Sequence, residues 1–512
     1  WDKNRKVYME FGIDYNRTFG LHKTTALILY NQSKYYSPSL QYYVPNAYQG
    51  LVGRLTYEYA SRYLAEFNMG YNGTENFAKG KRFGFFPAVS LGWVISEEKF
   101  FPKNNIVKYL KVRGSYGEVG NDQIGGDRFL YLPSSYGAAS DSGVNKYNFG
   151  LASNPYTSLM IVENKIGNPD LTWEKAKKMN VGVDINLFNN CLTASFDIFK
   201  EKRNNILANR STSPMIIGAN LPAYNFGEME NRGWEMDLNF RHHIQDFHYW
   251  ARFNYSFARN EIIYMDEVQK RYDYQMTTGR RKNQFFGLIF DGYYNSWEEI
   301  NALDRPKSSW SGNQLQPGDV KYIDVNQDGV IDDYDMVPIG YTPVPEIIYG
   351  FSFGAQYKGF DFSILFQGAD NVSIKYFGRS MWPFAKGEES AKSLIKERWT
   401  QERYEAGEKI TFPRLSLNPN GETDHNYRPS TLWIRDASYL RLKNLEVGYT
   451  FTGGFVKRLN LNSVRLYFNG SNLFTWTDVV DLDPEAPSRS GNVEINTYPL
   501  QKVYNIGLNI NF

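Results

Sequence analysis

The sequence has little of what disulfide-bonded proteins, membrane helices and nucleic-acid-binding proteins carry. Its one cysteine, Cys191, excludes an internal disulfide. No apolar run approaches the roughly 20 residues that a transmembrane helix needs. The net charge is only +2, so no electrostatic attraction to nucleic acid is expected.

Motifs of metal-dependent and phosphate-binding enzymes are missing as well. The chain contains neither H-E-x-x-H nor G-x-x-x-x-G-K-[ST], and the glycine-rich stretch 114–120 has no lysine. Three of the five histidines, His242, His243 and His248, cluster around a predicted hairpin without a second set of metal ligands. A polar turn explains them best, and the sequence predicts no enzyme activity.

Aromatic residues in short alternating runs are what the sequence has in abundance. They make up 17% of the chain, and the final segment, "YNIGLNINF", shows the pattern clearly. One face of it is apolar and the other carries asparagine and glycine. The apolar face consists of Tyr504, Ile506, Leu508, Ile510 and Phe512.

Similar runs of about ten residues recur along the chain, and this is the length that a tilted strand needs to cross a bilayer. We predict an all-β fold of about fifteen strands. In 438–452 the apolar phase slips near Asn444, which predicts a β-bulge. The predicted strands are 5–16, 21–30, 50–59, 62–72, 85–96, 108–118, 177–188, 191–202, 232–241, 247–260, 346–357, 360–369, 438–452, 462–472 and 500–512.

The connections between these strands alternate in length, which is typical of a transmembrane antiparallel β-barrel. The alternation places short turns in the periplasm and long loops outside, with Phe512 at the periplasmic rim. A secreted all-β glycan-processing enzyme would explain the aromatic residues but not the alternation. The predicted extracellular loops include 119–176, 203–231, 261–345, 370–437 and 473–499.

An odd strand count leaves the first and last strands parallel, which prevents antiparallel closure. The sequence also opens on Trp1 without an initiator methionine or signal peptide, and is soon in a strand. We therefore expect residues 1–512 to be the C-terminal part of a barrel domain. Further strands would come from an upstream polypeptide.

Several stretches resemble the SusC-like TonB-dependent outer-membrane transporters. They follow the order of that family along nearly the whole chain. They are "RFGFFPAVSLGWVISEEKFF" (82–101), "LKVRGSYGEVGN" (110–121), "GNPDLTWEKAKKMNVGVD" (167–184), "GEMENRGWEMDL" (227–238), "PGDVKYIDVNQDGVIDDYD" (317–335) and "WIRDASYLRLKNLEVGYTF" (433–451).

The resemblance implies a barrel of about 22 strands around an N-terminal plug in the outer membrane of a Gram-negative bacterium. It also implies import of oligosaccharides or peptides with a SusD-like surface lipoprotein, powered by TonB through the plug. The plug and the TonB-contacting peptide are absent from this sequence, and the cargo is not specified. The alternative is a structural scaffold subunit of a larger outer-membrane assembly, which would keep the barrel without import.

The stretch "DVNQDGVIDDYD" (324–335) matches the twelve-residue calcium loop. Hard oxygen donors at alternate positions can surround one cation, and Gly329 permits the tight turn. A solvated acidic turn is the alternative. We predict a structural Ca²⁺ site that rigidifies the long loop, with ligands Asp324, Asn326, Asp328, Val330 and Asp335.

Aromatic residues in the long loops are candidates for stacking on sugar rings or lining a peptide site, although loop packing is their commoner role. The stretch 386–409 is the most helical in the chain, and we expect one short amphipathic helix there. The substrate-binding candidates are Trp297, Trp310, Tyr376, Phe377, Trp382 and Phe384.

Overall fold

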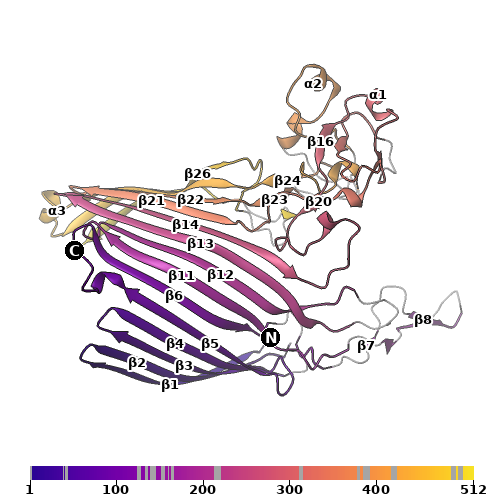
Figure 1. Ribbon diagram of the computed structural model, residues 1–512. Helices are drawn as coiled ribbons and strands as arrows, with labels where there is room; N and C mark the ends of the chain where they lie inside the picture. The colour runs from indigo at the N-terminus through magenta and orange to yellow at the C-terminus, as the bar shows by residue number, and fades with distance from the viewer. Residues whose placement is uncertain are drawn as a thin grey trace. The chain divides into compact units, whose positions relative to one another are not determined.

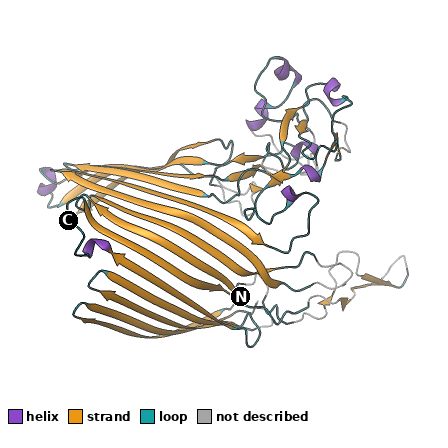
Figure 2. Cartoon of the chain, viewed as in Figure 1, coloured by secondary structure: helices purple, strands orange, loops and turns teal. Residues whose placement is uncertain are grey.

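The computed structural model is dominated by one 15-stranded antiparallel sheet (Figures 1 and 2). Its strands follow sequence order, from β1 at one edge to β28 at the other. This confirms the predicted fold class and strand count. The structure describes residues 3–38, 40, 44–123, 128–132, 137–138, 146–151, 156–159, 161–162, 166–212, 221–310, 315–376, 381–384, 393–416, 424–485, 492–493 and 500–512.

Each strand of the large sheet corresponds to one predicted strand. The strands are β1 (Arg5–Phe19), β2 (His22–Tyr36), β3 (Asn46–Tyr59), β4 (Tyr63–Thr74), β5 (Phe83–Val94), β6 (Val107–Asn121), β11 (Glu174–Leu187), β12 (Leu192–Ala208), β13 (Tyr224–Ile244), β14 (Phe247–Tyr264), β21 (Ile347–Tyr357), β22 (Phe360–Asp370), β25 (Tyr439–Phe451), β26 (Ser463–Thr477) and β28 (Val503–Asn511).

The remaining elements are short and lie in the connections. The strands among them are β7 (Gly137–Ala138), β8 (Lys146–Phe149), β9 (Tyr156–Leu159), β10 (Ile161–Val162), β15 (Phe286–Gly287), β16 (Phe290–Tyr293), β17 (Lys307–Ser308), β18 (Val320–Tyr322), β19 (Val330–Ile331), β20 (Val337–Pro338), β23 (Ser373–Tyr376), β24 (Ile434–Asp436) and β27 (Asn492–Val493). The α-helices are α1 (Trp297–Ile300), α2 (Gln401–Glu405) and α3 (Phe455–Arg458). No described helix has the length and apolar character to cross a membrane.

The chain divides into two compact units. The first comprises Trp1–Ile185, Asp197–Arg232 and Asn260–Val268, and the second comprises Asn186–Phe196, Gly233–Arg259 and Gln269–Phe512. Each unit contains its own run of neighbouring strands, with the connections that belong to it.

Apolar side chains form continuous rows across neighbouring strands, because residues opposite each other in the register share one face. In the first unit one row runs through Phe11, Tyr30, Leu51, Tyr71 and Phe85. The second unit has a comparable row. It consists of Tyr249, Ala355, Phe362, Val447, Phe468 and Ile506.

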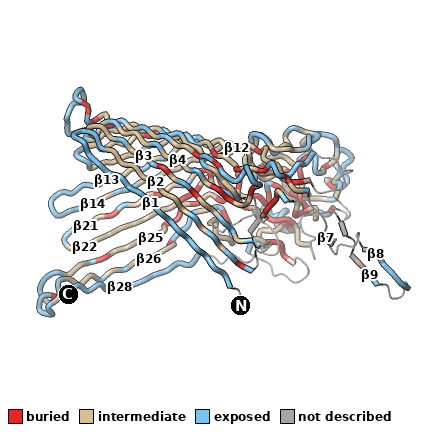
Figure 3. The backbone as a smooth tube through the Cα atoms, turned by 90° about the horizontal axis from the view of Figure 1, so that it is seen from below, coloured by how far each residue is buried: buried red, intermediate tan, exposed pale blue. Residues whose placement is uncertain are grey.

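These rows lie on a solvent-accessible face rather than in a core. On β28 the predicted apolar face is exposed, from 42% for Ile510 to 80% for Ile506, and Phe512 just beyond the strand is 87% exposed. Figure 3 shows both edge strands, β1 and β28, as exposed along nearly their whole length. Such a surface is suited to hydrocarbon, not to water.

Several strands are longer than predicted at the ends that carry long connections. β2 continues to Tyr36 and β12 to Ala208, so the connection predicted as 203–231 shrinks to 209–223. Toward this end of β12 charged side chains occupy both faces: consecutive Lys200 and Glu201 reach Glu230 at 2.9 Å and Lys178 at 3.3 Å. Pairing therefore continues where the apolar period that identifies the strand has already ended.

Connection lengths alternate as predicted over most of the sheet, with one exception. The connection 75–82 is shorter than the neighbouring 95–106, which contains a 3₁₀ turn at Ile95–Glu97. The other corrected bounds of the long connections are 122–173, 265–346, 371–438 and 478–502.

The predicted bulge is confirmed. The register of β25 shifts between Leu442 and Asn444 against β22 and β26 alike, so Lys443 has no direct partner in either strand. The extra residue reverses the side-chain phase within the strand.

The longest connections of the second unit fold together around a hydrophobic core of their own. We call the described residues of 269–345, 371–438 and 478–485 the loop module (Figure 1). Its core includes Leu288 and Val320 at 0% exposure and Phe412 and Tyr427 at 1%. The pairing of β23 with β24 joins the two ends of 371–438, and the bridge between Leu288 and Ser430 joins that connection to 269–345.

The single helix expected in 386–409 is wrong for the described part of that stretch. A 3₁₀ turn at Ser393–Glu397 is followed by the separate helix α2. Thr400 is extended between them and caps α2 by accepting a hydrogen bond from the Arg403 N–H. Leu394, Ile395 and Trp399 pack against the loop core instead of forming one helical stripe.

Candidate functional site

The face of the sheet opposite the apolar rows carries polar and charged side chains in register. In the first unit two adjacent rows cross from β2 to β6. One row is Thr25, Thr56, Glu66, Ser90 and Ser115, and the other is Lys23, Glu58, Leu64, Gly92 and Arg113.

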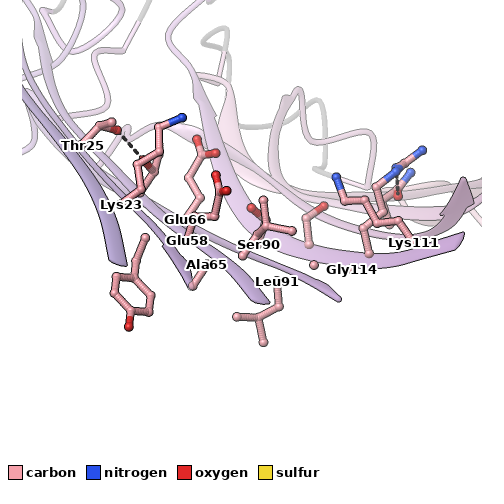
Figure 4. A pocket seen from close by; sticks show the side chains of 16 residues that line it. Lys23, Thr25, Glu58, Ala65, Glu66, Ser90, Leu91, Lys111 and Gly114 are labelled. Atoms are coloured by element: carbon pink, nitrogen blue, oxygen red, sulfur yellow. Dashed lines mark hydrogen bonds between the residues drawn. The ribbon is translucent and has the colours of Figure 1, made fainter. Parts of the chain in front are cut away.

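These two rows line an open cavity of about 440 Å³. Figure 4 shows Lys23, Glu58, Glu66 and Lys111 on one side of the strands and Leu91 on the other. Gly92 leaves room for the Lys111 side chain in the cavity, because a Cβ at position 92 would come within 3.2 Å of Lys111 Cε. The cavity therefore offers hydroxyl groups and charges of both signs, which suits a hydrated, hydroxyl-rich ligand or a water path.

Arg113 organises the polar face next to this cavity. Its Nη1 and Nη2 donate to the Asp197 carboxylate at 2.6 and 2.7 Å, and Nε and Nη2 donate to Asp184 at 3.1 and 3.3 Å. Only glycine fits at position 182, because a Cβ would lie 2.7 Å from Arg113 Cζ. A guanidinium shared by two carboxylates holds three strands in fixed positions.

The second unit repeats this arrangement with different residues. Arg465 donates to Asp361, with an Nε–Oδ1 distance of 3.0 Å, and also to Glu446. A Cβ at Gly448 would lie 2.6 Å from Arg465 Nη2, so glycine again makes room for the arginine. Inward-pointing charges in an otherwise alternating strand were the sequence signal for these clusters, and the sequence analysis did not single them out.

A buried arginine anchors the connection after β26. The Arg441 side chain is 2% exposed, and its Nη2 donates to Asp483 at 2.7 Å while Nη1 donates to Glu485. Tyr439 and Lys443 also donate to Glu485, at 2.7 and 3.3 Å. The segment 483–485 is thus fixed to the polar face of β25.

Within the loop module a second buried network joins distant connections. Asp319 accepts from Asn426 Nδ2 at 2.8 Å and pairs with Arg414 Nε at 2.6 Å. His425 donates from Nε2 to the Val320 carbonyl at 2.8 Å and accepts from Ser308 at Nδ1. Burial lowers the pKa of His425, against the opposing effect of its carbonyl partner and nearby carboxylates.

The aromatic candidates predicted for substrate binding lie in different environments. Tyr376 and Trp382 are 3% and 4% exposed within the loop core. Trp310 packs against that core and lies under the Arg428 guanidinium at 4.0 Å. Trp297 on α1 is 54% exposed and Phe384 is half-buried, while Phe377 lies outside the described residues. Trp297 is the most exposed of the described candidates.

The acidic loop 324–335 is ordered by its own backbone. Asp324 accepts from the N–H groups of Gln327 at 2.7 Å and Gly329 at 2.8 Å, and Asp328 accepts from Val330 at 3.0 Å. Asp335 is fully buried, and burial raises its pKa. No group of three or more His, Cys, Asp or Glu side chains converges to hold a metal anywhere in the described residues. The calcium site stays a prediction.

One sequence motif that is typical of hydrolases lies inside a strand. Residues 350–354 read "GFSFG", which matches the G-x-S-x-G of hydrolases. They lie inside β21, which is paired on both sides, whereas a nucleophile serine requires a sharp turn between a strand and a helix.

Comparison with known proteins supports the same class. The TonB-dependent receptor SusC of Bacteroides thetaiotaomicron is 28% identical over 477 residues, which covers 92% of this chain and 44% of that protein. The TonB-dependent receptor P3 of Formosa agariphila is 28% identical over 479 residues, covering 90% and 45%. The chain spans about half the length of the curated relatives it matches.

A structure of the RagAB peptide transporter superposes on all of this chain and 56% of its own, with a TM-score of 0.75 and 22% identity. At that identity the likeness concerns the fold. The family of TonB dependent receptor-like β-barrels matches residues 1–473. Its members are transporters of the Gram-negative outer membrane rather than enzymes, as predicted. The chain therefore belongs to the TonB-dependent receptor β-barrel family, as a SusC/RagA-like barrel that covers part of a full-length receptor.

Proposed function

We propose that this chain is the barrel portion of an outer-membrane importer that takes up oligosaccharides or peptides with a SusD-like lipoprotein. The two-faced sheet is the observation that supports this most. Its apolar rows suit hydrocarbon, and its opposite face holds hydroxyl groups and charges of both signs around a 440 Å³ cavity. Such a face keeps water and hydroxyl-rich cargo solvated.

In this proposal the connections that contain the loop module are extracellular, together with 122–173 and 209–223. The loop module has a preformed core, so it offers a surface of defined shape to cargo and to the lipoprotein. TonB acts through a plug supplied by an upstream part of the full-length receptor. The exposed apolar face of β28 and Phe512 serve in barrel assembly.

The test is uptake by cells that carry the full-length receptor. Fluorescent oligosaccharides and peptides should enter cells with the receptor and TonB, and should not enter when either gene is deleted. An affinity-tagged receptor should also co-purify a surface lipoprotein. A receptor that retains its lipoprotein but imports neither cargo class would favour the scaffold function instead.

A further inference from the structure

A second cavity, of about 390 Å³, lies within the loop module of the second unit. Its walls come from Tyr376 at the end of β23, from 393–397 and 409–411, and from 478–480. Three cations line it: Arg435 on β24, Lys396 in the 3₁₀ turn, and Lys409, which pairs with Glu397.

Arg435 lacks the acidic partner that several other arginines of this module have among the described residues. Arg281 pairs with Glu346, Arg414 with Asp319, and Arg403 with Glu408 at 2.7 Å. The Nε of Arg435 is buried and has no hydrogen-bond partner, and no ion pair of Arg435 or Lys396 is found in the described part of the chain. Leaving a buried charged donor unsatisfied is costly, so this group is poised for an acceptor.

The carboxylates in the cavity wall do not supply that acceptor. Glu397 already accepts from Thr411 Oγ1 at 2.8 Å and from Lys409 Nζ at 3.3 Å. Asp478 is exposed at the rim, and no ion pair joins it to Arg435 or Lys396 among the described residues. The cavity therefore has an excess of positive charge on its Arg435 and Lys396 walls.

Hydrogen bonds fix the walls to one another. The Tyr376 hydroxyl accepts from the Val480 N–H at 2.8 Å and donates to the Val480 carbonyl at 3.2 Å. Ser393 donates to Asp481 across the same pair of connections. The cavity is thus preorganised, which lowers the entropic cost of binding.

We propose that this cavity binds a carboxylate group of the cargo, held by the Arg435 guanidinium with Lys396 as the second cation. The planar fork of arginine matches the two oxygens of a carboxylate. That carboxylate can belong to an acidic sugar or to the C-terminus of a peptide. The carboxylate chemistry rests on the cavity alone, and only its role as a cargo contact depends on the proposed importer function.

The test is calorimetric titration of the purified full-length receptor in detergent. Trigalacturonate is compared with neutral galactotriose, and trialanine with its C-terminal amide. We expect at least one acid to bind about tenfold or more tightly than its neutral counterpart. Arg435→Gln should remove that preference, Lys396→Ala should weaken it, and Arg403→Gln, whose arginine is paired and does not line the cavity, should retain it.

Which acid binds identifies the source of the carboxylate. Equal binding of acid and neutral probes, or an acid preference that survives both Arg435→Gln and Lys396→Ala, overturns the proposal. Lys396 is exposed, so its variant keeps the test valid if Arg435→Gln disturbs folding. A receptor that binds an acid selectively but imports no cargo would contradict the importer function, and the carboxylate site would still stand.

Discussion

The sheet and the loop module place their apolar side chains in opposite ways. On β28 the residues of the predicted apolar face are 42–80% exposed, whereas Leu288, Val320 and Phe412 in the connections are 0–1% exposed. In a water-soluble protein the strands would form the core and the loops would lie on its surface. The strands are therefore adapted to hydrocarbon, while the loop module has a buried core like that of a small water-soluble domain.

We expect the largest loss of stability where a buried charge fixes a connection to a strand. Arg441→Ala would leave Asp483 and Glu485 without their main partner, and breaking a buried pair costs about 3–5 kcal/mol. We expect a lower Tm of the full-length receptor and faster proteolysis within 478–502. Arg54→Ala is the control: its side chain is 52% exposed, and such a pair contributes about 0–1 kcal/mol. Equal effects of the two substitutions would contradict this account.

A charge on the apolar face tests whether that face contacts hydrocarbon. Ile506→Lys should cost about 2–4 kcal/mol near the bilayer midplane and reduce the amount of folded receptor in outer-membrane fractions. Asn505→Lys places the same charge on the opposite face of β28 and should be tolerated. If Ile506→Lys inserts as well as the native protein, the face does not lie in lipid.

The loop module should respond to pH as a water-soluble core with a buried histidine does. Burial holds the pKa of His425 below its ordinary 6.5, so the unfolded state binds a proton more readily than the folded state. The stabilisation is complete above that ordinary value. It falls by up to about 1.4 kcal/mol per pH unit below it. Proteolysis of the loop module should accelerate from pH 7.5 to 5.5, and His425→Gln should flatten that dependence.

The smallest effect concerns the acidic loop, whose backbone hydrogen bonds already order it. If the loop binds Ca²⁺, adding the ion should raise the Tm of the full-length receptor by roughly 2 °C, since it stabilises one local segment. Asp328→Asn should abolish the shift. A Tm that is unchanged by Ca²⁺ would leave the solvated acidic turn as the explanation.

The strands could be predicted because their signal is local: period 2 is visible within about ten residues. The network of the loop module could not, because Asp319 and Asn426 meet across 107 residues with no shared local pattern. Tyr376 illustrates the limit. Its ring is 3% exposed, and its hydroxyl group fastens the segment that carries Val480, which no local pattern in the sequence indicates. Composition identifies an aromatic loop but not which rings remain open.

Because Lys443 is unpaired, the alternation of side chains in β25 reverses at this residue. Even-numbered Leu440 and Leu442 therefore share a face with odd-numbered Leu445 and Val447. If Lys443 were instead paired in an unbroken ladder, every residue before it in the strand would turn to the opposite face. Arg441 would then project into hydrocarbon and Leu442 onto the polar face. The bulge at Lys443 thus decides on which face of the sheet Arg441 lies, and with it the segment 483–485 that Arg441 binds.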